Sequence, residues 1–186
     1  SSSETMKYTG SEITINGLTV SSGENEGLVN GHTHNVTFEA KGTDVGVYEG
    51  TITAKDAVEI KSGDTDVTKN YDITVVNGKL TITKTDDEFE ISLDDDEYVY
   101  DATAHANTKT ATSTATTGDT TYTYSLEENG TYVSDLSSLT KVDAGEYTIY
   151  VKGVNPNYST VATTTATLTI TKRPVTFTGE TDTRVY

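Results

Sequence analysis

The chain has 186 residues, of which 29 are acidic and 13 are basic, so its formal net charge is −16. It contains no cysteine, which excludes a disulfide framework and a thiolate zinc site. The acidic balance disfavours nucleic-acid binding, and no apolar run approaches the ~18 residues that cross a membrane as a helix. No signal peptide or sorting tail is recognisable, so we expect a segment of a longer chain.

Threonine, valine and tyrosine are abundant, and they favour strands because β-branched and aromatic side chains fit a pleated, half-buried surface. Alternating apolar and polar residues, the pattern of a strand with one buried face, recur along the chain. The alternating segments, in chain order, are 36–40, 89–93, 122–126 and 147–151. No window carries apolar residues at helical spacing, so we predict an all-β chain with essentially no helix.

A β-hairpin is predicted at Asn77-Gly78. Asn-Gly is the preferred two-residue type I′ turn, because both central residues need a positive φ. Folding at that turn would pair Val75 with Leu80 and Ile73 with Ile82, which places these four aliphatic side chains on one face. The pattern therefore predicts antiparallel strands on the two sides of the turn.

Half of the net charge lies in residues 85–97, which contain eight acidic residues and no basic residue. The blocks before and after this segment are only mildly acidic. Such a local change in composition indicates a boundary between two modules.

Short sequence motifs recur in the same order in the two halves of the chain, which indicates tandem repeats. The paired motifs are 7–10 with 99–102, 44–48 with 143–147, 70–71 with 157–158, and 80–84 with 168–172, and residues 184–186 begin the first motif a third time. We therefore predict a first module over 1–84, a second over 85–172, and the opening strand of a third over 173–186. The first module lacks an equivalent of the strand predicted at 89–93. A module of this length suits an immunoglobulin-like or Greek-key β-sandwich.

The Asp-x-Gly-x-Tyr motif predicts a tyrosine corner. In Greek-key sandwiches, a tyrosine at the start of the sixth strand turns its hydroxyl back onto the upstream backbone. Tyr147 fits this role well, because a Thr-Ile-Tyr-Val strand follows it. Tyr48 fits less well, because Gly50 interrupts the strand just after it.

Residues 100–105 (YDATAH), 143–148 (DAGEYT) and 166–176 (ATLTITKRPVT) resemble the bacterial Ig-like surface repeats of the MBG/YDG type. Residues 27–32 and 70–84 are similar to a longer-looped variant of them. Each of the segments 8–10 and 100–102 departs from the Tyr-Asp-Gly signature at one position. The resemblance implies tandem, all-β modules of large extracellular adhesins on Gram-positive cell walls, with a non-catalytic role. It brings no catalytic residues.

The acidic residues near the module boundary are candidates for Ca²⁺ ligands, since hard cations bind six to eight oxygens. The candidates are Asp86, Asp87, Glu88, Asp94, Asp95, Asp96 and Glu97. Their spacing does not match an EF-hand loop, and adjacent residues of a strand point to opposite faces. A solvated charged segment is therefore favoured, and we assign no cofactor.

Three histidines and the many carboxylates were considered as chemical sites. His32 and His34 would share one face of a strand, but zinc needs three or four ligands, and His105 lies in the other module. A glycosidase needs two carboxylates in one cleft, which composition alone does not indicate. No nucleophile elbow or phosphate loop occurs. We predict a protein that is not an enzyme, with no catalytic, cofactor or metal residues.

The sequence contains candidate residues for two kinds of covalent modification. Three glycosylation sequons begin at Asn35, Asn129 and Asn157. An isopeptide cross-link would join Lys7 to Asn70 or Asn77, with a buried acid between them.

Two functions remain open. The leading one is a structural stalk that projects a distal binding head from a bacterial surface. The alternative is a module that itself binds host glycan or protein, for which Tyr122, Tyr124 and Tyr132 are candidates. The expected partners are neighbouring repeats, with no membrane contact in this segment. The strand at 174–178 is expected to complete the open edge of a neighbouring copy's first module, in a weak head-to-tail association.

Overall fold

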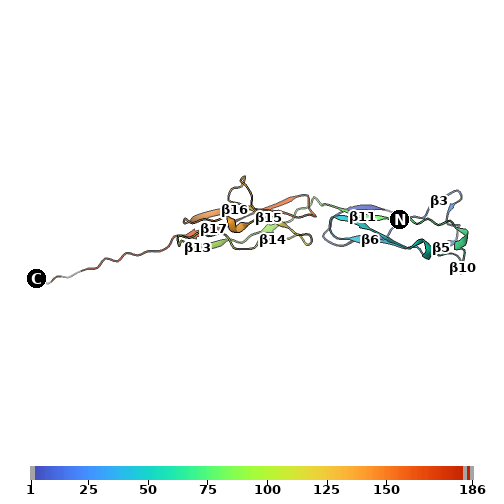
Figure 1. Cartoon of the computed structure of the whole chain (residues 1–186), viewed down its shortest axis with the longest axis horizontal. Coiled ribbons are helices and arrows are strands. Elements are labelled where there is room, and N and C mark those ends of the chain that lie inside the picture. Colours follow the sequence, from blue (N-terminus) through green and yellow to red (C-terminus); the bar gives the residue numbers. More distant parts are fainter. Residues whose placement is uncertain (1–2, 182–183, 185–186) are drawn as a thin grey trace. The chain divides into compact units, whose positions relative to one another are not determined.

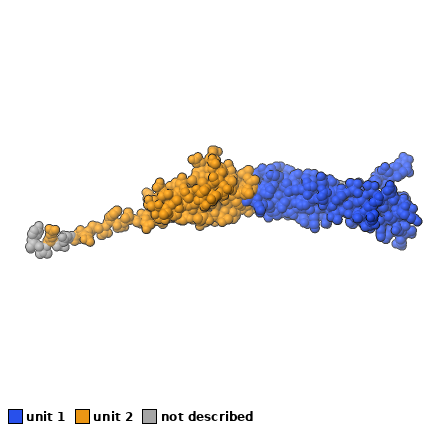
Figure 2. All heavy atoms as spheres, in the orientation of Figure 1, with its two compact units in different colours: residues 1–88, 115–120, 155–160 blue, residues 89–114, 121–154, 161–186 orange. Residues whose placement is uncertain are grey.

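The computed structural model describes residues 3–181 and residue 184. Its regular structure consists of strands and three single-turn 3-10 helices, so the all-β prediction is confirmed for the described residues. The chain forms two compact units, shown in different colours in Figure 2. Unit 1 comprises residues 1–88, 115–120 and 155–160, and unit 2 comprises residues 89–114, 121–154 and 161–186.

Unit 1 contains eleven strands and two 3-10 turns among its described residues, several of them labelled in Figure 1. They are β1 (Glu4–Lys7), β2 (Ile13–Ile15), β3 (Ser22–Gly23), β4 (Glu26–Gly27), β5 (His32–His34), β6 (Phe38–Gly42), β7 (Gly46–Glu49), β8 (Thr51–Ile52), η1 (Lys55–Ala57), β9 (Ile60–Ser62), β10 (Thr65–Asp66), η2 (Thr68–Asn70) and β11 (Lys79–Thr83).

Two three-stranded sheets, β1-β11-β7 and β2-β6-β8, enclose the core of unit 1. The alternation of β2, β6 and β11 places every second side chain inside. The core consists of Tyr8, Ile13, Ile15, Phe38, Ala40, Leu80 and Ile82. Burying an aliphatic side chain such as Leu80 contributes about 1.5–3 kcal/mol. The smaller sheets β10-β9-β5 and β3-β4 extend the unit beyond this sandwich.

Unit 2 is an immunoglobulin-like β-sandwich with longer strands. Its elements are β12 (Ile91–Ser92), β13 (Asp96–Val99), β14 (Thr112–Ser113), β15 (Thr121–Ser125), η3 (Leu136–Ser138), β16 (Gly145–Val154) and β17 (Val161–Thr171). The sheet β13-β17-β16-β15 and the pair β12-β14 contribute opposite walls of the core. The buried aliphatic and aromatic residues are Phe89, Ile91, Leu93, Ala111, Tyr124, Ile149, Val151, Ala162, Ala166, Leu168 and Ile170. The predicted alternation at 89–93 and 147–151 is confirmed by this burial.

Both units place a short opening strand parallel to the closing strand. In unit 1, Met6 lies opposite Ile82, and in unit 2 Tyr98 lies opposite Ile170. The tyrosine that follows each opening strand donates its N–H to the closing strand: Tyr8 to Thr83 O at 2.8 Å, and Tyr100 to Thr171 O at 2.9 Å. The two repeat motifs therefore make the same bonds.

Both predicted tyrosine corners are present. The hydroxyl of Tyr48 donates to Asp44 O at 2.8 Å, and that of Tyr147 donates to Asp143 O at 2.9 Å. Gly50 does separate β7 from β8, as the sequence suggested. The interruption comes after the corner, so it leaves the Tyr48 bond intact.

The predicted hairpin at Asn77-Gly78 is wrong. Neither residue has a positive φ, so no type I′ turn forms, and residues 73–76 are not in a strand. The Asn77 amide instead donates to Gly50 O at 2.6 Å, and Gly50 N–H donates to Gly78 O at 2.9 Å. These tertiary bonds hold the backbone extended into β11, and they outweigh the local turn preference.

Candidate functional site

A cluster of polar side chains in unit 1 is linked by a continuous set of hydrogen bonds. We call it the Asp44 cluster; its members are Tyr8, Asp44, Thr117, Asn155 and Asn157. Tyr8 follows β1, and Asp44 lies in the turn between β6 and β7. Thr117 and the two asparagines come from the segments 115–120 and 155–160, which belong to unit 1 although they are distant in sequence.

Asp44 and Asn157 form the centre of this cluster. The Asn157 amide nitrogen donates to Asp44 Oδ1 at 2.7 Å, and the amide oxygen accepts the Val45 N–H at 2.8 Å. The Thr117 hydroxyl also donates to Asp44 Oδ1, and it lies 2.7 Å from the Tyr8 hydroxyl. Hydrogen bonds to a charged carboxylate are roughly twice as strong as those between neutral groups. Asn157, which is 0% exposed, is therefore fixed in one orientation.

Asn155 organises the two segments that carry these side chains. Its amide nitrogen donates to the carbonyls of Thr117 and Gly118 at 3.1 and 3.0 Å, and its oxygen accepts the Asn157 N–H at 3.0 Å. Gly118 has φ +73°, and an added Cβ would lie 2.8 Å from Asn157 Nδ2. Glycine is therefore needed here for both its conformation and its small size.

Backbone and ring contacts complete the cluster. Thr85 N–H donates to Asn157 O at 3.1 Å, and Ser159 N–H donates to Thr85 O at 2.9 Å. The rings of Tyr8 and Tyr158 meet edge-to-face with centroids 5.5 Å apart. Burial, together with the neighbouring Tyr8 and Asp87, raises the pKa of Tyr158 above its ordinary value.

The chemistry of the Asp44 cluster is that of a structural clamp. Among the described residues, no buried side-chain nitrogen or oxygen lacks a hydrogen-bond partner. A network that is fully satisfied holds its members in one arrangement. The Asn157 sequon lies inside this network, so its side chain is not accessible in the folded chain.

A groove of about 390 Å³ lies in unit 1. Its walls are largely aliphatic and include Leu18, Leu28, Val58, Ile60 and Ile73, with His34, Tyr71 and Asp72 as the chief polar groups. It contains one carboxylate, whereas glycoside hydrolysis needs two. Mainly hydrophobic walls with a few polar groups are typical of ligand pockets.

The histidines are held by protein groups. His32 Nδ1 lies 2.7 Å from the Tyr71 hydroxyl, and His34 Nδ1 accepts the Val36 N–H at 3.1 Å. His105 Nε2 lies 2.9 Å from Asp101, and its ring stacks on Tyr98 at 4.3 Å. Across the described residues, no three histidine or carboxylate side chains are placed to hold a metal ion.

The acidic residues near the predicted module boundary make separate bonds. Asp86 pairs with Lys7, Asp87 accepts from the Thr85 hydroxyl at 2.7 Å, and Asp95 accepts the Thr167 N–H at 2.7 Å. Lys7, the lysine considered for an isopeptide bond, is therefore paired with a carboxylate.

Asp96 is the most strongly perturbed carboxylate of the acidic segment. Burial raises its pKa, but the N–H and hydroxyl of Thr108, at 2.9 and 2.8 Å, together with Lys109 at 3.4 Å, lower it more. The resulting pKa is about 2.

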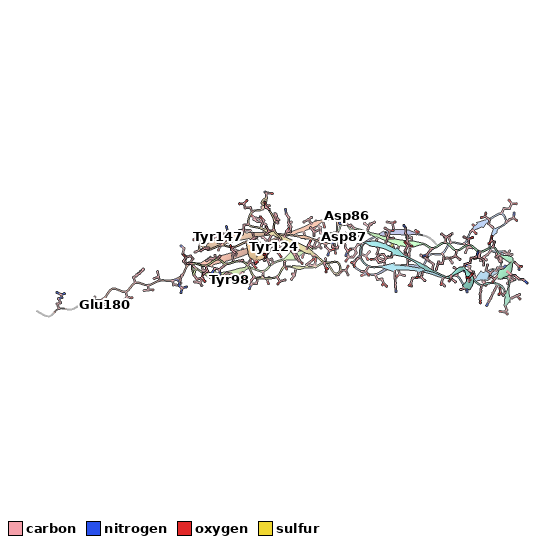
Figure 3. The ribbon with its side chains drawn as sticks, viewed as in Figure 1. Asp86, Asp87, Tyr98, Tyr124, Tyr147 and Glu180 are labelled. Atoms are coloured by element: carbon pink, nitrogen blue, oxygen red, sulfur yellow. The ribbon has the colours of Figure 1, made fainter. Side chains whose placement is uncertain are left out.

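The three candidate tyrosines of unit 2 do not form one site. Tyr122 and Tyr124 lie on β15 opposite Gly153 and Val151, and Tyr124 is buried in the core. Tyr132 lies under the Lys152 ammonium, 3.9 Å from its ring centroid, and Lys152 projects from the other face of that sheet. Figure 3 labels Tyr124 with Tyr98 and Tyr147, which come from three strands of the same sheet.

Sequence reasoning identified Asp143, Tyr147 and the Asn157-Tyr158 pair as repeat landmarks, but it missed the contact between Asp44 and Asn157. These residues are 113 positions apart. The only available signal was that each lies in a repeated motif, which does not reveal that the two motifs meet.

No family model and no curated protein matches this sequence. Among solved structures, the fibronectin(III)-like modules of CbhA from Clostridium thermocellum are similar, with 11% identity, a TM-score of 0.34, and coverage of 97% of this chain and 96% of that chain. No helix in the described part of the chain is long and apolar enough to span a membrane.

Proposed function

We propose that the chain is a non-catalytic structural segment of a large bacterial cell-surface adhesin, built from tandem repeats of the MBG/YDG type. The repeats divide as 1–84, 85–172 and 173–186, and the segment acts outside the cell as a stalk. Its partners are neighbouring repeats of the same chain.

The observation that carries this proposal is the reuse of one set of bonds by the repeated motifs. The bond between Tyr8 and Thr83 in unit 1 recurs between Tyr100 and Thr171 in unit 2. The tyrosine corner of Tyr48 recurs at Tyr147. Tandem modules that share their packing in this way suit an extended array, in which each module contacts only its neighbours.

The Asp44 cluster supports a load-bearing role. It joins the end of β1, the β6–β7 turn and two distant segments through hydrogen-bonded side chains, of which Tyr8, Asn155 and Asn157 are buried. A site for chemistry would instead present an accessible group of perturbed acidity in a cleft.

A second candidate function, the binding of a host glycan or protein, is favoured by one observation. The groove of about 390 Å³ in unit 1 has a volume within the range of ligand pockets. Leu28 lines this groove, whereas the neighbouring Val29 is 59% exposed and does not line it.

Binding of the intact chain to a glycan array and to immobilised mucin separates the two functions. The stalk proposal predicts no saturable binding. Saturable binding that is lost in Leu28→Gln and kept in the matched control Val29→Gln would overturn the stalk proposal in favour of a binding module.

A further inference from the structure

Unit 2 carries a second copy of the residues that hold the two segments in unit 1. Tyr100 corresponds to Tyr8, because each follows the opening strand and donates its N–H to the closing strand. Asp143 and Ala144 correspond to Asp44 and Val45, because each pair begins the turn that makes the tyrosine corner. The residues that follow the closing strand also correspond: 172–175 in unit 2 match 84–87 in unit 1.

In unit 1 these residues bind the segments 115–120 and 155–160. Asp44 accepts from Asn157 and Thr117, the Val45 N–H donates to Asn157, and Thr85 exchanges backbone bonds with Asn157 and Ser159. Tyr8, whose ring packs against the core and Tyr158 and whose hydroxyl meets that of Thr117, is only 3% exposed.

In unit 2 the corresponding residues are exposed. Tyr100, Asp143, Ala144 and residues 172–175 line a hollow of about 440 Å³. Tyr100 is 36% exposed, against 3% for Tyr8. The carboxylate of Asp143 is exposed and makes no hydrogen bond within the described part of the chain, whereas its backbone carbonyl makes the corner bond with Tyr147.

We propose that this hollow is the docking site for two loops of a further repeat, one that continues from residues 173–186. This inference rests on the proposed repeat function. The loops have the chemistry of 115–120 and 155–160: an asparagine amide binds the Asp143 carboxylate and the Ala144 N–H. A threonine hydroxyl bridges Asp143 and Tyr100, and a tyrosine ring packs against the edge of Tyr100.

The differences between the two sets are compatible with this occupant. Arg173 stands where Thr85 stands, and it retains the backbone N–H and carbonyl that Thr85 uses. Pro174, which has no N–H, stands at the position of Asp86, whose role in unit 1 is a side-chain bond to Lys7. Val99 stands at the position of Lys7, so both partners of the exposed Lys7–Asp86 ion pair are replaced in unit 2.

The exposed segment that leaves unit 2 favours a repeat in the same chain. Lys84 leads directly from β11 to Thr85, and Lys172 leads in the same way from β17 to Arg173. Phe177, the counterpart of the buried Phe89, is 91% exposed. A following sandwich would cover this side chain while its loops reach the hollow.

The test uses a chain of three repeats, made by joining a second copy of residues 101–172 after Tyr186, compared with the 186-residue chain. Amide hydrogen exchange is followed at Ala144 and Arg173. The proposal predicts at least tenfold slower exchange of both amides in the longer chain. Asp143→Ala abolishes the slowing at Ala144, whereas the matched control Glu146→Ala, an exposed acid on β16, leaves it in place.

Equal exchange rates in the two chains, with slow exchange at the appended copies of Ile149 and Leu168, would overturn the proposal, because the appended repeat would then be folded without docking. If the appended repeat does not fold, a second chain is made with residues 85–172 joined directly after Lys172, so that the appended repeat has all its strands. The exchange rate of the Ala144 amide in the first copy then gives the result. Slowing produced by adding unlinked chain would assign the hollow to a second copy and overturn the assignment to a following repeat. None of these outcomes alters the glycan-array result, so the two proposals fail separately.

Discussion

Asn157 binds both the carboxylate of Asp44 and the N–H of Val45, with the two bonds at 2.7 and 2.8 Å. One side chain thus satisfies a charged acceptor and a backbone donor of the same turn. Asn157 is itself fully buried, so its replacement removes the partner of the Val45 N–H and one of the donors to Asp44, which keeps the Thr117 hydroxyl. Removing a partner from a buried polar group costs more than the bond itself contributes.

Asn157→Ala should lower the free energy of unfolding by about 1–3 kcal/mol, because the Val45 N–H loses its partner and the Asp44 carboxylate loses one of its donors. Asn129→Ala is the matched control, since Asn129 is exposed, and a surface substitution changes stability by about 0.5 kcal/mol or less. Urea unfolding measures both values. Equal stabilities for the two variants would show that the Asp44 cluster does not support the fold.

Gly118→Ala should destabilise the chain more than Gly63→Ala. Both glycines have positive φ, +73° and +58°, but only at Gly118 would a Cβ meet a buried neighbour, whereas nothing lies within 4 Å at Gly63. Backbone strain alone costs about 1 kcal/mol, and the clash with Asn157 should add about 1–2 kcal/mol. Thermal unfolding of the two variants compares the costs; a smaller loss at Gly118 would contradict the close packing described there.

The stability of unit 2 should depend on pH through Asp96. Its pKa in the folded chain is about 2, below that of an unfolded aspartate, so the charged form stabilises the fold. This contribution is complete above about pH 4 and is lost as the pH falls toward 2.

Asp96→Asn should therefore be less stable than the wild type at pH 7 and should lose less stability between pH 4 and pH 2. Glu97→Gln, at an exposed neighbouring position, is the control and should keep the wild-type pH dependence. Urea unfolding at pH 7, 4 and 2 measures the change. An unaltered acid response in Asp96→Asn would remove Asp96 as its source.

The exposed segment 174–178 should cause weak self-association, by adding as a strand to the first unit of a neighbouring copy. Phe177→Ser removes an apolar side chain that is 91% exposed, and it should raise the dissociation constant about tenfold. Thr176→Ser is the control. Sedimentation equilibrium over a range of concentrations measures the constant, and a chain that is monomeric throughout would refute this association.

The sequence predicted the strands well where burial alternates, as at 89–93 and 147–151, because a period of two reflects packing that is local to one strand. It predicted the corner at Tyr147 for the same reason: the bond to Asp143 spans four residues. The hairpin at Asn77-Gly78 was wrong because its local turn preference competes with bonds to Gly50, 27 residues away.

The candidate site was beyond sequence reasoning for a related reason. Its bonds depend on where two separate segments fold, and an isolated asparagine or threonine in a polar chain carries no sign of its partner. The repeated motif shows that Asp44 and Asp143 are equivalent. Only the structure shows that Asp44 is hydrogen-bonded to Asn157 whereas Asp143 lines a hollow.

A double-mutant cycle between Asp44 and Asn157 is the most direct test of the central claim, that a buried clamp holds the segments of this structural repeat together. The free energies of unfolding are measured for the wild type, Asp44→Ala, Asn157→Ala and the double variant. A coupling energy of about 1–3 kcal/mol is expected, as for residues in one hydrogen-bond network. A coupling energy near zero, with the two single effects simply adding, would contradict it.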